Sequence, residues 1–256
     1  MANSNGARIW VTRPEHQTDR LLQLSAEQGV EAVRFPTLAI VAQEDSEPIQ
    51  KRLANLAKFQ WLVFISANAV NFAVKANGGK IRHHSGLRFV AIGSATAQAM
   101  QAAGLPVDLM PAEGQNSEAL LAMDAMQAVT GQGFLLVRGS GGREDLAAAL
   151  RARGADVEYL EVYKRVIPHK GNSCVPVLLA TGQLDVVTVT SVETLKNLLV
   201  MVGAAAKQQL LETPLVVMSD RIKGCAVEMG FKRVAVTQSP SDAAMLETVT
   251  TMVTGG

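Results

Sequence analysis

The sequence predicts an α/β protein built from two similar domains, each with a parallel sheet. Short apolar runs alternate with segments of helical spacing along the 256 residues, which is typical of βαβ units. The chain is long enough for two domains that each bury a core of their own. The second half also repeats features of the first half at an almost constant distance, and such long-period self-similarity indicates duplication.

Four matches in the same order make up the repeat. One match would mean little, because every α/β chain reuses strand-turn-helix patterns. The matched pairs, 125 residues apart for the first three and 126 for the last, are Arg13 and Arg138, Gly29 and Gly154, Ser66 and Ser191, and Gly104 and Gly230. Two copies are too few for a solenoid, so we expect two related α/β domains with a ligand cleft between them.

Apolar runs bounded by turn residues predict the strands. The predicted strands are 9–12, 32–35, 37–42, 62–65, 88–92, 107–109, 134–137, 157–167, 186–190, 215–218 and 233–236. Segment 37–42 stands apart from the pattern, so we expect a connecting strand there. Segment 157–167 is longer than a typical strand and could cross from one domain to the other.

Helical spacing and end signals predict the helices between these strands. Asn116 or Ser117 is a plausible N-terminal cap, and Gly29 and Gly154 are expected to end helices. The predicted helices are 19–28, 48–58, 67–75, 95–103, 117–128, 143–153, 173–181, 192–201, 204–211, 221–229 and 241–252. Residues 77–86 contain clustered glycines and polar residues and are predicted to form a surface loop.

Composition limits the classes of function. The net charge of +1 gives no overall attraction to nucleic acid or membranes, and the aromatic content of 4% argues against a base-stacking surface. Cys174 and Cys225 are the only cysteines, which predicts a reduced compartment. The longest apolar run, 198–206, is too short to span a membrane, and the first residues, MANSNGAR, lack an apolar stretch that could serve as a signal peptide. We therefore expect a cytoplasmic protein.

Polar residues gather where the predicted strands lead into helices. In open parallel sheets, ligands bind at the carboxyl ends of strands, where free N–H groups favour carboxylates or phosphates. The candidate substrate-binding residues are Arg13, Ser66, Asn68, Ser94, Thr96, Arg138, Gly139, Arg143, Ser191 and Ser219. Helix capping is the alternative role for each hydroxyl and requires no ligand.

The segment RGSGGRED, residues 138–145, is the densest of these turns. Its glycines could form an anion-binding nest flanked by two guanidiniums. It lacks the Gly-Lys-Ser/Thr sequence of the P-loop. It also fails to match the dinucleotide fingerprint, because Glu144 stands where the last glycine of that motif would be. A glycine-rich turn with solvated arginines is the simpler alternative.

Tyr163 is the candidate catalytic residue. It is one of two tyrosines and has Lys164 and Arg165 as neighbours, whose charges could help a phenol act as a proton donor. A partly buried structural tyrosine is the alternative. The pair His83-His84 has no acid or cysteine at ligand spacing, so we expect a surface pair and neither a metal site nor a cofactor.

Several motifs together resemble the uroporphyrinogen-III synthase family. They are VTRP near the start, FIS-x-NAV, VAIG-x-x-TA, LLVRG-x-x-GR followed by RGA and VY-x-R, and finally SDRI and SPSDAAML. The motifs span nearly the whole chain, and their order and spacing are more specific than any one of them. Ile222 and Lys223 depart from the pattern, because that turn often carries Thr-Ala in the family.

The resemblance implies a reaction, a fold and a site. The family converts hydroxymethylbilane to uroporphyrinogen III with inversion of ring D and loss of water, through a spiro intermediate and without metal or organic cofactor. The implied fold has two α/β domains, 1–36 with 168–256 and 37–167, joined by a two-stranded ladder near 37–41 and 163–167. The crossing-strand tyrosine of the family falls on Tyr163, and Ser66, Thr96 and Ser191 fall on polar turn positions. The implied partner is the linear tetrapyrrole, with possible hand-over from hydroxymethylbilane synthase to a monomeric enzyme.

Two other classes of function stay open at this point. A two-domain α/β protein that binds an anion or a nucleotide sugar would also have a cleft, but it should carry a nucleotide fingerprint or an acidic ribose partner. A regulatory module fused to a tetrapyrrole methyltransferase would need a partner domain, whereas we expect this chain to be free-standing.

Overall fold

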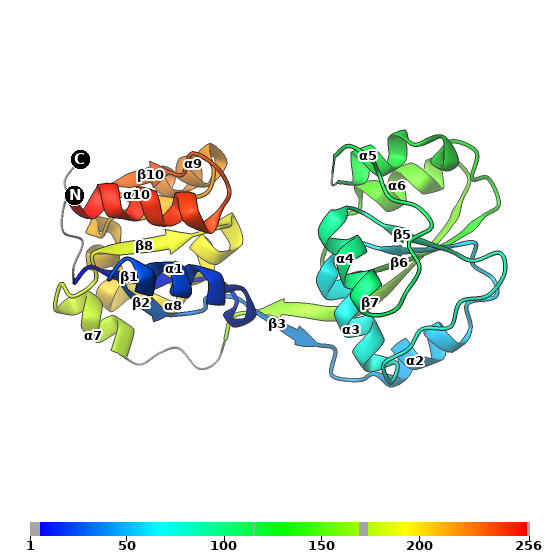
Figure 1. Cartoon of the computed structure of the whole chain (residues 1–256), viewed down its shortest axis with the longest axis horizontal. Coiled ribbons are helices and arrows are strands. Elements are labelled where there is room, and N and C mark those ends of the chain that lie inside the picture. Colours follow the sequence, from blue (N-terminus) through cyan, green and yellow to red (C-terminus); the bar gives the residue numbers. More distant parts are fainter. Residues whose placement is uncertain (1–5, 115, 169–173, 255–256) are drawn as a thin grey trace. The chain divides into compact units, whose positions relative to one another are not determined.

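The computed structural model describes residues 6–114, 116–168 and 174–254. Contacts divide the chain into two compact units, which we describe separately. Unit 1 comprises residues 1–39 and 166–256, and unit 2 comprises residues 40–165. Each unit contains one sheet with helices against it (Figure 1).

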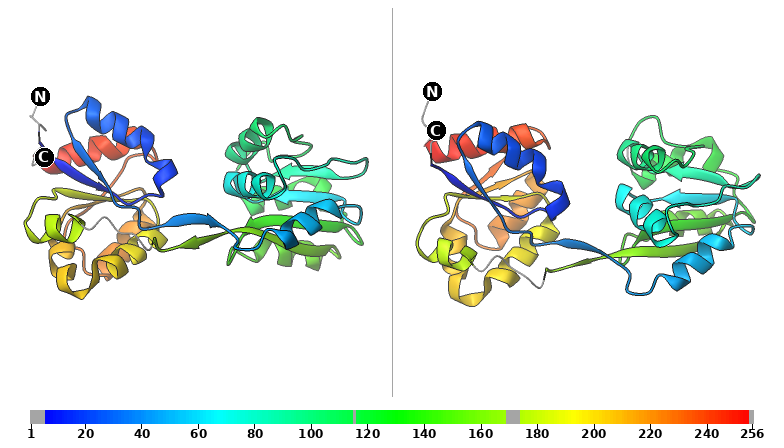
Figure 2. Two further views of the ribbon diagram at one scale, coloured as in Figure 1. Left: turned by 90° about the horizontal axis from the view of Figure 1, so that it is seen from below. Right: turned by 60° about the horizontal axis from the view of Figure 1, so that its bottom comes forward.

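Unit 1 has a five-stranded sheet whose hydrogen-bonded pairs are all parallel. Its strand order is β10-β9-β8-β1-β2, with bounds β1 (Arg8–Val11), β2 (Glu31–Arg34), β8 (Val186–Val189), β9 (Leu215–Val217) and β10 (Val234–Val236). Its helices are α1 (Asp19–Glu27), α7 (Cys174–Ala180), α8 (Val192–Glu212), α9 (Asp220–Glu228) and α10 (Asp242–Thr254). Figure 2 shows α1 and α10 on one face of this sheet and α7, α8 and α9 on the other.

Unit 2 has the strand order β3-β7-β6-β4-β5. The strands are β3 (Ala39–Ala42), β4 (Trp61–Phe64), β5 (Arg88–Ala91), β6 (Gly133–Gly139) and β7 (Asp156–Val166). The helices are α2 (Glu47–Ala54), α3 (Ala67–Ala76), α4 (Ser94–Ala102), α5 (Ser117–Ala122) and α6 (Asp145–Ala152). Strands β4 to β7 pair in parallel, whereas the arrows of β3 and β7 point in opposite directions in Figure 1.

Side chains along the strands of unit 2 alternate between the two faces of the sheet, and those on each face form a separate core. On one face, Leu62 and Leu135 pack with residues of α2, α3 and α4. On the other face, Val63 and Leu136 pack with residues of α5 and α6. Strands buried on both faces explain why the sequence shows continuous apolar runs instead of alternating ones.

The two sheets share one strand order. The order β2-β1-β8-β9 in unit 1 corresponds to the order β7-β6-β4-β5 in unit 2. In this correspondence β1, which ends near Arg13, matches β6, which ends near Arg138. Likewise β8, which precedes Ser191, matches β4, which precedes Ser66. The matched sequence segments therefore occupy matched places in the two units. The predicted α/β fold with two parallel sheets is confirmed.

Three predicted elements depart most from expectation. Residues 107–109 form a single bridge between Leu109 and Val90, because the Asp108 carboxylate accepts the Phe89 amide at 2.7 Å in place of a backbone carbonyl. The helix expected to reach residue 128 ends at Ala122, since Met123 is extended. The helix expected to reach residue 58 ends at Ala54, and the chain turns to bury Leu56 and Phe59.

The predicted break between helices 192–201 and 204–211 is present within α8. Gly203 has a φ of 71°, in the left-handed region that glycine adopts without strain, and it separates two helical segments. No helix in the described part of the chain is long and apolar enough to cross a membrane.

Candidate active site

A pocket of about 310 Å³ opens in unit 2 where the parallel strands end and the following helices begin. This volume lies at the lower end of the range for ligand pockets. The lining residues follow β4 and β5, belong to β6 and β7, or start α5 and α6: Ile65, Ser66, Ile92, Asn116, Ser117, Leu136, Arg138, Gly139, Gly142, Arg143, Leu146, Tyr159, Tyr163 and Arg165. The location agrees with the general rule for ligand sites in parallel sheets.

Tyr163 and Ser66 meet at the wall of this pocket. The phenol oxygen of Tyr163 lies 3.2 Å from Oγ of Ser66, and the same Oγ accepts a hydrogen bond from the amide of Ala69 at 3.1 Å. Ser66 is thus the N-terminal cap of α3. The Tyr163 residue is 3% exposed, and its ring lies 5.6 Å from that of Phe72 between centroids. The phenol is therefore held in one place.

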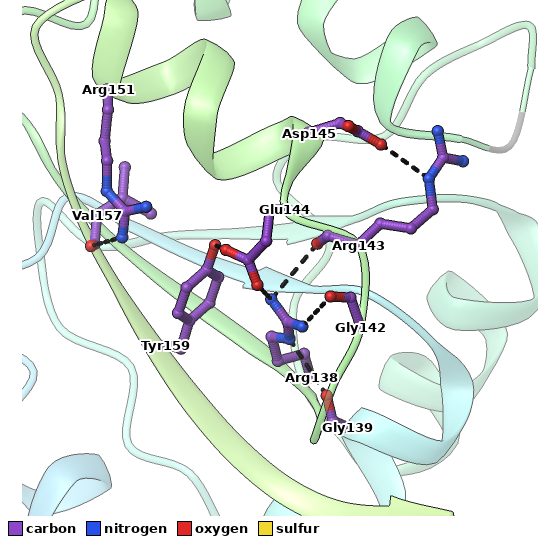
Figure 3. Close-up of polar contacts among 9 residues, drawn as sticks. All are labelled: Arg138, Gly139, Gly142, Arg143, Glu144, Asp145, Arg151, Val157 and Tyr159. Carbon is purple, nitrogen blue, oxygen red and sulfur yellow. Dashed lines mark hydrogen bonds and ion pairs between the residues drawn. The ribbon is translucent and has the colours of Figure 1, made fainter.

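Arg138 holds the turn that follows β6 (Figure 3). Its Nε donates to the carbonyl of Gly139 at 3.2 Å, and Nη2 donates to that of Gly142. Its Nη1 donates to the carbonyl of Arg143 at 3.4 Å and to the Glu144 carboxylate at 2.9 Å. The side chain is only 5% exposed. All three nitrogens of Arg138 thus have partners within the RGSGGRED segment.

A second tyrosine completes this cluster. The Tyr159 hydroxyl donates to the Glu144 carboxylate, and the Tyr159 ring lies beneath two guanidiniums, 4.5 Å from that of Arg138 and 5.3 Å from that of Arg151. The hydrogen bonds from Tyr159 and then from Arg138 lower the pKa of Glu144. Partial burial and then the bond to Glu144 raise the pKa of Tyr159. Tyr159 is therefore neutral and Glu144 is anionic at neutral pH.

Arg143 differs from Arg138 in its exposure. Its side chain is 72% exposed, and it forms ion pairs with Asp145 at 2.9 Å and Glu118 at 3.1 Å. The hydrogen bond to Asp145 is the main reason that the pKa of Arg143 is raised. Arg143 therefore presents a permanent charge at the mouth of the pocket, where an anionic ligand would compete with two carboxylates for it.

The structure brings five of the predicted site residues together in this pocket. These residues are Ser66, Arg138, Gly139, Arg143 and Tyr163. Asn68, Ser94 and Thr96 belong to the same unit but do not line the pocket. Thr96 is 2% exposed and lies inside α4, and Gly93 takes the capping position in front of Ser94.

The other three predicted residues belong to unit 1. Arg13 is 9% exposed and forms an ion pair with Asp242, and its Nη2 has no hydrogen-bond partner among the described residues. Ser191 and Ser219 are the N-terminal caps of α8 and α9. Together with Ser66, these serines have the capping role that the sequence offered as the alternative to ligand binding.

The departure at Ile222 also has a structural reason. The Ile222 side chain is 5% exposed and packs in the core beside α8, while its amide donates to Ser219 Oγ at 3.4 Å. An apolar residue at this position therefore fills the core of unit 1.

Sequence reasoning missed Tyr159 and Glu144 as parts of the cluster. A signal for Tyr159 was available, since its place on β7 puts it on the same face as Val157, above α6. Glu144 could have been recognised as an acid at a helix start. The contacts of Tyr159 with Arg138 and Glu144 depend on the pairing of β6 with β7, which no local pattern shows.

The grouping of possible metal ligands is limited in the described part of the chain. Among residues 6–114, 116–168 and 174–254, no three His, Cys, Asp or Glu side chains are grouped as a metal ion would require. His83 lies against Phe89 with the rings tilted and 5.3 Å between their centroids, and its Nε2 lies 4.0 Å from Asp108.

Comparisons with known proteins agree on one family. The family model described as uroporphyrinogen-III synthase HemD matches residues 19–247. The uroporphyrinogen-III synthase of Salmonella typhimurium is 30% identical over 240 residues, which cover 93% of this chain and 98% of that protein. The uroporphyrinogen-III synthase of Chlorobaculum parvum is 26% identical over 230 residues, which cover 88% and 90%.

Solved structures support the same fold. A mutant uroporphyrinogen III synthase from the extremely thermophilic bacterium Thermus thermophilus superposes with a TM-score of 0.65 at 18% identity and covers 98% of this chain and 100% of its own. The uroporphyrinogen-III synthetase of Helicobacter pylori gives a TM-score of 0.60 at 14% identity, with coverages of 94% and 97%. At these identities the structures establish the fold, and the sequence matches establish the relationship. The chain belongs to the uroporphyrinogen-III synthase family.

Proposed function

We propose that this protein is a cyclising hydro-lyase that converts hydroxymethylbilane to uroporphyrinogen III and water. The family membership supports the reaction, and one observation in the structure supports the site. Tyr163, the residue that the family resemblance marks as catalytic, lines the unit 2 pocket and has its hydroxyl beside Ser66.

Tyr163 acts as the proton donor in this proposal. The substrate loses its terminal hydroxyl to form an azafulvene, and a proton from the phenol allows that hydroxyl to leave as water. The substituted α-carbon of ring D then attacks the electrophilic azafulvene carbon to give the spiro intermediate. The original methylene bond at the spiro carbon then breaks, and the released methylene carbon bonds to the free α-carbon of ring D, which inverts the ring. Loss of the proton from that α-carbon restores the aromatic pyrrole and returns a proton to the phenolate.

Positioning contributes more than acid strength to such a reaction. A linear tetrapyrrole has many rotatable bonds, and holding its two ends together converts their meeting into a pre-organised step. The N–H groups at the starts of α3, α5 and α6 and the guanidinium of Arg143 are suited to the carboxylates of the substrate. Arg138 acts indirectly in this scheme, because it fixes the turn that carries Gly142 and Arg143.

The remaining site residues have weaker roles in the proposal. Five of them are proposed to support substrate binding through the helix starts to which they belong: Asn68, Ser94, Thr96, Ser191 and Ser219. Arg13, which follows β1, is proposed to support binding through its guanidinium. We further propose that the enzyme is a cytoplasmic monomer without metal or organic cofactor and that it takes its substrate from hydroxymethylbilane synthase. Dialysis against a chelator should leave its activity intact. Light scattering of the protein as it elutes from a size-exclusion column should give the mass of one chain.

The reaction is tested by the isomer of the product. Purified protein is mixed with freshly made hydroxymethylbilane, the products are oxidised to porphyrins, and isomers I and III are separated by chromatography. Isomer III should predominate, while heat-denatured protein gives only isomer I from spontaneous closure. If the native protein also gives only isomer I, the proposed function is wrong.

A further inference from the structure

Strand β7 contains one extra residue next to the pocket. Its pairing with β6 runs in step from Gly133 and Asp156 up to Arg138 and Glu161. The next pair is Gly139 and Tyr163, so the register shifts by one residue at this point. The extra residue in β7 is a β-bulge, a feature that changes the direction of side chains and is frequent beside active sites.

The bulge moves Tyr163 to the other face of the sheet. Tyr159 packs on the face covered by α6, whereas Leu160 and Val162 pack on the face covered by α3. Regular alternation would put Tyr163 on the side of Tyr159, because side chains two residues apart share a face. Tyr163 instead belongs to the same core as Val162, its immediate neighbour. On this face its hydroxyl meets Ser66.

Gly139 provides the space for the ring in this position. A Cβ atom built on Gly139 would lie 2.5 Å from Cζ of Tyr163 and closer still to Cε2, and real Cβ atoms essentially never come within 3.0 Å of another atom. Gly139 is not among the glycines with a positive φ. The absence of a side chain at residue 139 is therefore required by the ring of Tyr163 and not by the backbone conformation.

The backbone strengthens this arrangement. The amide of Ser140 donates to the carbonyl of Tyr163 at 2.9 Å, and the Ser140 hydroxyl accepts from the Gln43 side chain at 2.7 Å. The turn after β6 is thus tied to the strand that carries Tyr163 directly beyond the bulge. The ring lies close to Gly139, and its centroid is 5.6 Å from that of Phe72.

We propose that Gly139 is a positioning residue for Tyr163: its bare backbone, with the bulge in β7, holds the phenol hydroxyl beside Ser66 at the pocket wall. The consequence for turnover rests on the proposed function, whereas the position of the ring does not. Gly139 acts through Tyr163 and needs no contact with the substrate.

The position of the ring is tested first, without any substrate. The chain has only two tyrosines, so protein labelled with ring-¹³C tyrosine gives two sets of NMR signals that Tyr159→Phe and Tyr163→Phe assign. Gly139→Ala should shift the Tyr163 signals much more than those of Tyr159. Tyr163 signals that stay at their wild-type positions would overturn the proposal.

A stability measurement covers the case in which Gly139→Ala folds poorly. The urea midpoint should fall for Gly139→Ala in the wild-type background but hardly at all when the ring has been removed by Tyr163→Val. An equal fall in both backgrounds would show that the ring is not what residue 139 accommodates. Gly224→Ala is the matched control, because a Cβ on that glycine of α9 has nothing within 4 Å; its midpoint should not fall.

Turnover then separates positioning from a merely structural role. Gly139→Ala should lower kcat per folded molecule about as much as Tyr163→Phe, roughly 100-fold, and change KM less. The double variant should be no slower than Tyr163→Phe alone. If the losses in kcat of the two single variants multiply in the double variant, Gly139 acts independently of the phenol hydroxyl, which contradicts the proposal. If the wild-type protein makes no isomer III, the proposed function fails, and the NMR and urea results alone decide the role of Gly139.

Discussion

The hydroxyl of Tyr163 lies 3.2 Å from Oγ of Ser66, and both side chains line one pocket. Ser66 Oγ already accepts the amide of Ala69 at the start of α3. A serine hydroxyl has two lone pairs and one proton, so it can accept from both Ala69 and Tyr163 while its own proton points elsewhere. The start of a helix thereby fixes the orientation of a proposed proton donor.

Tyr163→Phe should lower turnover and leave the fold intact. The variant keeps the ring against Gly139 and Phe72 but removes the proton, so kcat should fall roughly 100-fold, the lower end of the range for general acid catalysis. Steady-state kinetics with separated isomers measures this change. A variant with wild-type kcat would remove Tyr163 from the mechanism.

Ser66→Ala should affect both stability and turnover. Loss of the helix cap should cost about 0.5–2 kcal/mol in the free energy of unfolding, and loss of the contact with Tyr163 should reduce kcat. Ser241→Ala removes a comparable contact, the bond from the Ala244 amide at 3.2 Å, in the other unit. It should reduce stability alone. Equal kcat in the two variants would contradict a role for Ser66 in orienting the phenol.

Arg138 and Arg143 should respond differently to replacement by lysine. A lysine at 138 keeps the charge but cannot reach three carbonyls and a carboxylate at once, so at least one charge-assisted hydrogen bond should be lost, about 1.5–3 kcal/mol. Arg143→Lys should leave the free energy of unfolding close to that of the wild type, because exposed ion pairs contribute little. Urea denaturation compares the two. Similar losses in the free energy of unfolding would show that the buried hydrogen bonds of Arg138 stabilise the fold no more than the exposed ion pairs of Arg143.

Tyr159 should lose its proton at a higher pH than an ordinary tyrosine. Burial and the anionic Glu144 both oppose the phenolate, which raises its pKa above 10. In Tyr163→Phe, Tyr159 is the only tyrosine left, so absorbance near 295 nm follows it alone. Below pH 10 the folded and unfolded chains both keep this proton, and stability should decline as the pH rises further. A titration midpoint at or below 10 would contradict this prediction.

Glu144 should contribute to stability down to acidic pH. Its pKa in the folded protein is below 4.5, chiefly because Tyr159 donates to it. As the pH falls, the unfolded chain takes up this proton first, so the contribution is complete above pH 4.5 and is lost as the pH passes through the lowered pKa. The fall in urea midpoint from pH 6 to pH 3 should be smaller in Glu144→Gln than in the wild type. A fall of the same size in both would exclude this contribution.

The sequence was informative wherever the evidence was local. Strands buried on both faces and the break at Gly203 depend on neighbouring residues and were predicted at the right places. Capping by Ser66 and Ser191, which the structure shows, was the alternative to the predicted substrate binding. The duplicated segments also predicted two related sheets, because matched sequences pack in matched ways. Local evidence was sufficient for the fold class and for the residues at strand ends.

The rest depends on contacts between distant segments. The bulge in β7 is visible only once β6 is paired beside it, and the cluster of Arg138, Glu144 and Tyr159 needs the same pairing. The failed prediction at 107–109 has a similar origin, because a side chain of Asp108 replaced a backbone partner. Patterns of hydrophobicity do not predict which strands pair or where a side chain replaces a backbone hydrogen-bond partner.

The division of unit 1 into two segments has a consequence for synthesis of the chain. Unit 2 is one continuous segment, 40–165, whereas β1 pairs with β8, which begins at Val186. At about 5–20 residues per second, β1 leaves the ribosome roughly ten to thirty seconds before β8. During that time Ile9, Trp10 and Val11, all fully buried in the finished protein, have no neighbour on the β8 side. Unit 2 can complete its sheet first, and a nascent chain stopped after residue 165 would carry an apolar, half-paired strand that invites aggregation.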